Sequence, residues 1–240
     1  MKVPYFSDGL TDRQIFVMMH YIRALKTTPD DLHYIKSEEY AHDLFPIDIV
    51  VFEPTKEFDY YVVGTVGLSD YRFDKNFSRS ELIMALPKTW KPIFDKEEYY
   101  WAPQMVRDIA YCVLERKEGT YPGQVYLLTD ESLQAEGGTY SPQTDAVGAI
   151  LTFPEMFSLE MYEREMYHSY VRFLQVVPID KNDVQKLDEI GPADFIKFDL
   201  HDSEGPTMVV KLKEKPLQGI DKLVKQNEDA LKNNTSTDKE

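Results

Sequence analysis

The stretch Tyr60-Tyr-Val-Val-Gly-Thr-Val-Gly-Leu-Ser-Asp70 decides the fold of this 240-residue chain. Its first seven residues are mostly aromatic or β-branched, which is typical of a strand, and Gly67-Leu-Ser-Asp70 is typical of a turn. A similar run over residues 47–52 precedes it across a turn-forming Pro-Thr-Lys-Glu segment. The two runs are therefore predicted to form a β-hairpin.

The flanking segments alternate between helical and strand-like patterns. Thr11-Asp-Arg-Gln14 has the form of a capping box, and apolar residues then recur at helical spacing up to Leu25. Pro103 is predicted to begin a second helix that ends at Gly119. Further strands are predicted over residues 80–86, 124–128, 146–152 and 171–177, with a short helix over 180–190 that Gly191-Pro192 ends. This order predicts an α/β (α+β) fold, a mixed and largely antiparallel β-sheet flanked by helices.

The chain is acidic, with 27 Lys and Arg against 42 Asp and Glu and a formal net charge of −15 at pH 7. This charge argues against a nucleic acid as the main ligand and against docking on an anionic membrane. No apolar run approaches the ~20 residues of a membrane span, and the first residues lack the apolar core of a signal peptide. The single cysteine, Cys112, cannot form an internal disulfide. We therefore expect a cytoplasmic protein.

Aromatic residues divide the chain into a body and a tail. Every Tyr, Phe and Trp lies between Tyr5 and Phe198. Residues 211–240 carry seven Lys against six Asp and Glu, so the acidity belongs to the first 210 residues. No repeat or low-complexity linker divides that body. The prediction is one domain over residues 1–210 and a polar tail over 211–240, with one possible amphipathic helix at 217–231 and a disordered end.

Catalytic motifs are missing from the sequence. There is no Gly-rich phosphate loop, GxSxG, HExxH or CxxC motif, and the Gly64–Gly67 spacing is too short for a dinucleotide-binding turn. Glu165 and His168 have the spacing of two ligands on one helix face, but no second such pair exists. Cys112 lies on an apolar helix face, where core packing is expected. We therefore predict no catalytic residue, no metal site and no cofactor.

Two further features have ordinary structural interpretations. The charged run over residues 155–165 is predicted to be a solvated, partly helical face rather than a metal site. Trp90 and Trp101 flank a proline-containing segment and are expected to pack in the core or at a hinge. Paired carboxylates for hydrolytic chemistry cannot be singled out among 42 acidic residues.

Four segments in order resemble the Suppressor of Fused family. The first is the strand of residues 60–66 that runs into Gly67-Leu-Ser, and the second is Glu81-Leu-Ile-Met-Ala-Leu-Pro87, followed by Trp90 and the helix. The third is Ala146-Val-Gly-Ala-Ile-Leu-Thr-Phe-Pro154, and the fourth is Phe173-Leu-Gln-Val-Val-Pro-Ile179, with an acidic helix and Gly191 behind it. The resemblance covers roughly residues 30–195.

The resemblance implies a single Suppressor-of-Fused-like domain that binds a protein and does not catalyse a reaction. The animal member holds an extended peptide of a transcription factor beside its strands, but it has a second lobe that this chain lacks. Bacterial members of this size resemble immunity proteins or antitoxins. The expected partner is therefore a toxin domain, and the acidic body would attract a basic one.

Asp70 and Tyr71, at the end of the first strand segment, are the predicted partner-binding residues. A turn explains the residue types of Gly67–Asp70 equally well, since glycine supplies a positive φ and Ser or Asp caps backbone donors. Tyr60 and Tyr61 are possible anchors for a partner, although as strand residues they also suit a core.

Two other functions remain open. One is an enzyme of unrecognised type that uses dispersed carboxylates and His168 in a cleft, for which a deep pocket with convergent His and Glu side chains would be the mark. The other is an adaptor whose C-terminal helix, over residues 217–231, docks on a partner.

Overall fold

The computed structural model describes residues 9–37, 46–73, 79–90, 101–135, 137–141, 144–157, 159–166, 168–198, 200–202 and 205–206. Within these ranges no helix is both long enough and apolar enough to cross a membrane. The predicted tail and its helix at residues 217–231 lie outside the described residues.

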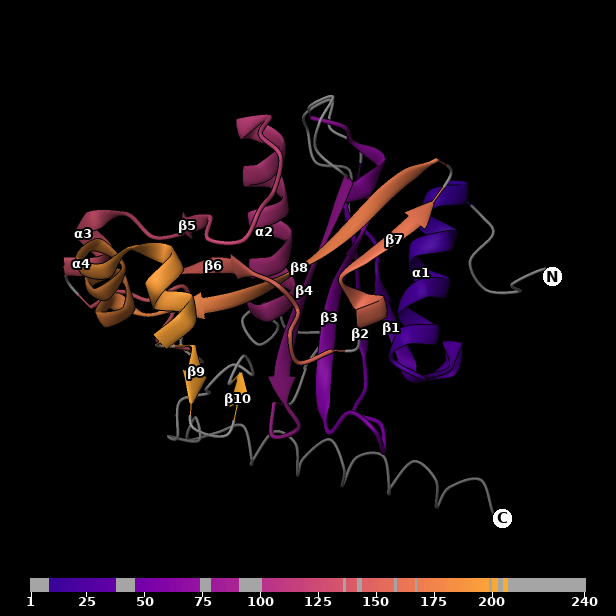
Figure 1. Cartoon of the computed structure of the whole chain (residues 1–240), viewed down its shortest axis with the longest axis horizontal. Coiled ribbons are helices and arrows are strands. Elements are labelled where there is room, and N and C mark those ends of the chain that lie inside the picture. The colour runs from indigo at the N-terminus through magenta and orange to yellow at the C-terminus, as the bar shows by residue number, and fades with distance from the viewer. Residues whose placement is uncertain are drawn as a thin grey trace, which may run out of the picture.

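An eight-stranded sheet forms the centre of the molecule (Figure 1). Its strands are β1 (Leu32–Ile35), β2 (Asp48–Phe52), β3 (Tyr60–Val66), β4 (Arg79–Pro87), β5 (Val125–Leu127), β6 (Gly148–Thr152), β7 (Glu163–Met166) and β8 (Ser169–Ile179). The order is β1-β2-β3-β4-β8-β6-β5, and β7 pairs with β8 outside this path. All neighbours are antiparallel except β4 and β8, which run parallel. A separate two-stranded sheet joins β9 (His201–Asp202) to β10 (Gly205–Pro206).

Strand β8 is long enough to serve three neighbours. One of its edges pairs with β4, and the other pairs first with β7, through residues 169–172, and then with β6, through residues 175–179. Strand β7 therefore lies at the margin of the sheet.

Helices cover both faces of the sheet. They are α1 (Asp12–Ala24), α2 (Trp101–Arg116), the short α3 (Glu131–Ala135) and α4 (Lys181–Phe198). Side chains alternate along β8, so Leu174 packs in the cluster that includes α2, whereas Phe173 and Val177 face the other side. Phe173 packs in the cluster with α1 and Val177 in the cluster with α4. Helices α1 and α4 thus share one face, and α2 covers the other.

Most of the predicted elements are present. Thr11 forms the expected capping box at α1, with its hydroxyl accepting from the Gln14 N–H and the Gln14 side chain accepting from the Thr11 N–H. The predicted hairpin is the β2–β3 pair. Both Trp90 and Trp101 are buried in the core.

Several boundaries differ from the prediction for physical reasons. Helix α2 begins at Trp101 and ends at Arg116, and Pro103 lies in its first turn, where a missing N–H breaks no helical hydrogen bond. Gly191 ends the first helical segment of α4, as predicted, because its φ of 80° and ψ of 161° are not helical. The sequence analysis did not predict the second helical segment, which continues from Pro192 to Phe198 beyond this kink.

The charged run over residues 155–165 was predicted to be a solvated, partly helical face. Its acidic side chains Glu155, Glu160, Glu163 and Glu165 are exposed, as predicted, but its helical part is short. Only a three-residue 3-10 helix, η4 (Leu159–Met161), forms there, and the chain then becomes β7. Strand β1 is likewise absent from the sequence-based prediction. Strand β7 is polar, so its strand character comes from pairing with β8 rather than from its own residues. Strand β1 has apolar residues that pack against the core, but it is only four residues long.

Candidate functional site

The carboxylate of Glu81 lies buried beneath the turn that follows β3. Glu81 is on the same face of β4 as Ile83 and Ala85, and its exposed fraction is 0%. One carboxylate oxygen, Oε1, accepts from the backbone N–H groups of Gly67 (3.2 Å) and Ser69 (3.0 Å). The other oxygen, Oε2, accepts from the Thr65 hydroxyl. Glu81 therefore fixes the conformation of the turn Gly67–Asp70 from below.

This environment changes the acidity of Glu81. Burial raises the pKa of Glu81 from 4.5 to about 7, although its hydrogen bonds with Ser69, Thr65 and Gly67 act in the opposite direction. A charged carboxylate in the core is costly even when donors surround it. Glu81 thus changes protonation near neutral pH.

Two glycines allow helix α1 to approach the turn closely. Gly67 has a φ of +120°, and a Cβ there would lie 2.9 Å from the Gln14 side chain. A Cβ on Gly64 would lie 2.9 Å from the ring of Tyr21, whose hydroxyl donates to the Thr65 carbonyl at 3.2 Å. The spacing of these glycines therefore serves helix packing and turn conformation.

Asp70 lies at the end of this turn and joins it to α1. Its carboxylate accepts from the Thr11 hydroxyl at 3.1 Å and lies 3.6 Å from Nε of Arg13. Burial raises the pKa of Asp70, against the smaller lowering effects of Thr11, Arg13 and Arg79. Arg79 donates to the carbonyl oxygens of Ser69 (2.8 Å) and Asp70 (2.7 Å). The predicted binding residue Asp70 is thus half-buried and engaged within the molecule.

The three predicted tyrosines lie partly inside the molecule. Tyr71 is half-buried, packs against the core on the α2 side and stacks on Phe73, with ring centroids 6.2 Å apart. Tyr61 contacts Trp90 edge to face at 5.2 Å, and Tyr60 contacts Phe157 edge to face at 6.0 Å. Their packing contributes to the core, and each keeps part of its surface in solvent.

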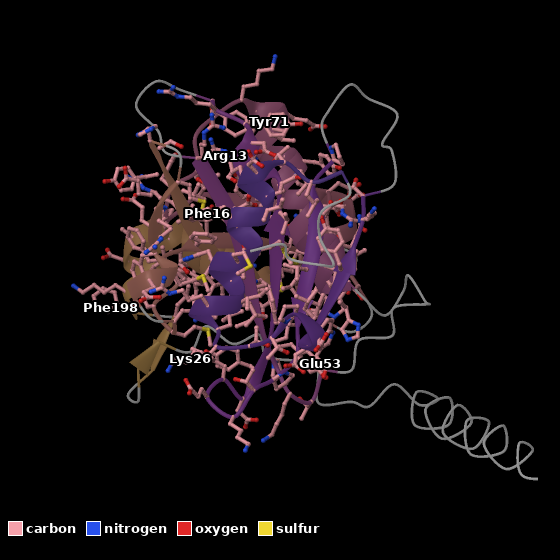
Figure 2. The ribbon with its side chains drawn as sticks, turned by 90° about the vertical axis from the view of Figure 1, so that its right-hand side faces the viewer. Arg13, Phe16, Lys26, Glu53, Tyr71 and Phe198 are labelled. Carbon is pink, nitrogen blue, oxygen red and sulfur yellow. The ribbon has the colours of Figure 1, made fainter. Side chains whose placement is uncertain are left out.

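Arg13 connects the turn to the β7–β8 hairpin. Its Nη1 donates to the hydroxyl of Ser169 at 3.0 Å, while its Nε faces Asp70. In Figure 2, Arg13 and Tyr71 lie toward one end of the molecule, with Phe16 below them and Lys26 and Glu53 at the opposite end. The candidate site is this end of α1 with the Gly67–Asp70 turn and the β7–β8 hairpin.

An open depression adjoins the hairpin. Its volume is ≈ 620 Å³, and its lining consists of Phe16, the four residues of β7 and His168. His168 adopts φ 62° in the connection between β7 and β8, so it and Glu165 do not share a helix face as their spacing suggested. Both side chains are exposed, and the depression is open to solvent. It therefore lacks the shielded, convergent geometry that a catalytic His–Glu pair would need.

The part of the chain that the structure describes contains neither a cluster of metal ligands nor an activated thiol. Over the described ranges, no three His, Cys, Asp or Glu side chains converge as ligands of one ion. Cys112 is half-buried against the core, and burial raises the pKa of its thiol. A raised pKa makes the nucleophilic thiolate scarcer.

Sequence reasoning missed two residues that organise this site, Glu81 and Arg13. Glu81 alternates with Ile83 and Ala85 on one face of an otherwise apolar strand. An acid at such a position indicates a buried carboxylate, which requires hydrogen-bond donors. The polar turn Gly67-Leu-Ser could have been recognised as their source. Nothing in the sequence indicates that Arg13 would reach Ser169, because that contact joins residues 156 positions apart.

A family model for "Suppressor of fused protein (SUFU)" matches residues 43–213 of the chain. The chain belongs to the Suppressor of fused family. The matched region contains the Gly67–Asp70 turn, Glu81 and the β7–β8 hairpin, and begins beyond α1. No curated protein sequence matches the chain.

Solved structures of Suppressor of fused proteins have the same fold at low sequence identity. A homolog from Neisseria gonorrhoeae FA 1090 is 16% identical, has a TM-score of 0.56 and aligns over 78% of this chain and 89% of its own. A crystal structure of a Sufu–Fu complex is 12% identical, has a TM-score of 0.60 and aligns over 85% of this chain and 91% of its own. Drosophila Suppressor of Fused is 12% identical, has a TM-score of 0.56 and aligns over 90% of this chain and 53% of its own. The chain therefore corresponds to about half of the Drosophila protein.

Proposed function

We propose that this Suppressor of fused domain binds a partner protein stoichiometrically, without turnover, and neutralises it as a bacterial immunity protein or antitoxin. Membership of the Suppressor of fused family carries the proposal. A protein of similar fold has been crystallised as the Sufu–Fu complex, which supports protein binding as the use of this fold.

The partner we propose is a basic toxin domain. The net charge of −15 and the many exposed carboxylates would attract a basic surface over long range. Exposed acids occur on separate elements of the described structure, including α2, α3, β7 and α4: Glu115, Glu131, Glu163, Glu165, Asp188, Glu189 and Asp194. Because these acids are dispersed, they would attract a basic partner to the body as a whole, and the shape of a local surface would determine where that partner binds.

Asp70 and Tyr71 remain part of the proposed contact surface. Both are half-buried and retain some exposed surface at the end of the sheet next to α1. Because Asp70 also contacts Thr11 and Arg13, its removal would disturb α1 as well as any partner. Stability must therefore be measured alongside binding for variants at this position.

Capture of the partner from the native cell tests the proposal. The tagged full-length chain should retain one protein in stoichiometric amount, and the purified pair should form a one-to-one complex by light scattering. Expression of that protein alone should arrest growth, and co-expression of this chain should restore it. Recovery of no stoichiometric partner overturns the binding role, and a partner that is harmless when expressed alone overturns the immunity role.

A further inference from the structure

Strand β7 has one edge paired with β8, and in the described structure no strand pairs with its other side. We call that side, along Glu163–Met166, the outer edge. The Phe173 N–H donates to the Tyr162 carbonyl at 3.0 Å, which makes this a hydrogen-bonded pair of the antiparallel ladder. Such pairs alternate, so Arg164 bonds inward to Val171, whereas the N–H and C=O groups of Glu163 and Glu165 point outward.

The depression follows this outer edge. Its lining includes all four residues of β7 in succession, although neighbouring residues of a strand point to opposite faces. A cavity over one face would be lined by alternate residues only. Phe16, on α1, lines the same depression and is 37% exposed. The space therefore lies beside the strand, where an added strand would lie.

The two faces of β7 differ in character at this edge. Glu163 and Glu165 share one face, where Glu163 lies 2.8 Å from Nε of Arg172. Among the described residues, Glu165 has no ion-pair partner within 4 Å. Arg164 and Met166 share the other face, which is turned toward α1: Met166 is buried in the cluster with α1, and the charge of Arg164 contributes, after burial, to lowering the pKa of His20.

We propose that the outer edge of β7 binds an extended segment of the partner protein as an additional strand, with basic and apolar residues alternating along that segment. The inference rests on the proposed protein-binding function and assigns it a site. Basic side chains of the segment would lie on the face of Glu163 and Glu165, and apolar side chains would pack toward Met166 and Phe16. The outward N–H and C=O groups supply main-chain hydrogen bonds.

A second copy of the chain is the wrong occupant for this edge. Antiparallel pairing of two β7 strands would place the glutamates of one copy opposite those of the other, and like charges directly opposite are unfavourable. The same charges that keep copies apart admit a basic strand.

The test is a titration of the isotope-labelled full-length chain with an acetylated and amidated peptide of alternating lysine and valine. Saturable NMR shifts should map to the amides of Glu163 and Glu165 and to Phe16. The same peptide N-methylated on the residues that face β7 should bind at least tenfold more weakly, because it cannot complete the ladder. Absence of saturable shifts, shifts confined to another surface, or equal binding of the methylated peptide overturns the proposal.

Matched variants separate the backbone from the charge. Glu165→Pro removes an outward N–H, which an edge strand tolerates, and should weaken binding at least tenfold, whereas Glu165→Val keeps that N–H and loses only the carboxylate, so its loss should be smaller. Glu118→Lys, just beyond α2, reverses the charge of an exposed residue that does not line the depression and should leave binding nearly unchanged. If Glu165→Pro fails to fold, the proposal is tested instead by comparing how the methylated and the unmethylated peptide bind to the wild-type chain.

The outcomes for the site and for the function differ. If Glu165→Pro folds and captures the native partner as well as the wild-type chain does, the site is wrong and the binding function stands. If the wild-type chain captures no partner, the function fails whatever the peptide does.

Discussion

Glu81 is an acidic residue at a position where the strand pattern calls for an apolar one. It occupies the row of Ile83 and Ala85 beneath α1 and uses its two oxygens to hold the Gly67–Asp70 turn. An apolar side chain would avoid the cost of burying a carboxylate but would leave two N–H groups without this acceptor. Glu81 thus fixes the turn next to the candidate site and lowers the stability of the fold at high pH, where its carboxylate is charged.

The pH dependence of stability tests this account of Glu81. Its pKa is raised from 4.5 to about 7, so between these values the folded chain holds a proton that the unfolded chain has lost. The contribution of Glu81 to the free energy of unfolding should therefore fall as the pH rises through this range, by an amount on the order of 3 kcal/mol, and level off above it. Urea unfolding between pH 4 and 8.5 measures this effect.

Glu81→Gln provides the comparison, since it resembles the protonated side chain. The variant should lose this part of the pH dependence and should be more stable than the wild-type chain at pH 8. Glu115→Gln makes the same change at an exposed position on α2 and should keep the wild-type profile. A pH profile for Glu81→Gln that parallels the wild type would contradict a proton uptake at this residue.

At the scale of elements, the β7–β8 hairpin determines how the candidate site is put together. Arg13 of α1 contacts Ser169 at the start of β8 and Asp70 at the end of the turn, so one side chain links three elements. The hairpin places Glu165 and His168 at the margin of the sheet in an open depression. This arrangement suits contact with another chain better than it suits enclosure of a small substrate.

Hydrogen exchange on individual amides tests the register of β7. The Arg164 N–H, which bonds inward to β8, should exchange slowly, whereas the N–H groups of Glu163 and Glu165, which face outward, should exchange at rates near those of an unstructured chain. Equal protection of all three amides would mean that the outer edge is covered in the free protein.

Sequence patterns predicted those elements whose own residues carry the information. Strands β2, β3, β4, β6 and β8 are rich in buried apolar residues, and the capping box of α1 is a local signal. Strand β7 was not predicted because Glu-Arg-Glu-Met becomes a strand only through its pairing with β8. Strand β1, Leu-His-Tyr-Ile, has apolar residues but is too short to give a clear strand pattern. Within the site, the contact of Arg13 with Ser169 joins residues 156 positions apart and has no local signal, whereas the place of Glu81 in an apolar row was a local signal that was not used. The resemblance to the Suppressor of fused family, the missing catalytic motifs and the acidic body pointed toward protein binding.

At the scale of the molecule, the prediction of one domain over residues 1–210 with a polar tail can be tested by limited proteolysis. The absence of aromatic residues after Phe198 predicts that cleavage first removes residues from the C-terminus and leaves a resistant core. Mass spectrometry of the early fragments identifies the site. Two stable halves from early cleavage in the middle of the chain would contradict the single domain.

The acidic surface is the property of the whole molecule that the proposed function uses. At ~0.15 M salt the screening length is ~8 Å, so attraction over longer distances weakens while contacts at the interface survive. Charge that steers a partner acts mainly on the association rate, and the packed centre of an interface acts mainly on dissociation.

The most direct measurement is therefore the salt dependence of both rate constants for this chain and its captured partner. We expect the association rate to fall steeply between ~0.05 M and ~0.5 M salt, by at least tenfold, while the dissociation rate changes much less. An association rate that is indifferent to salt would contradict a basic partner drawn by the acidic body, and the absence of a saturable one-to-one complex would contradict the binding function itself.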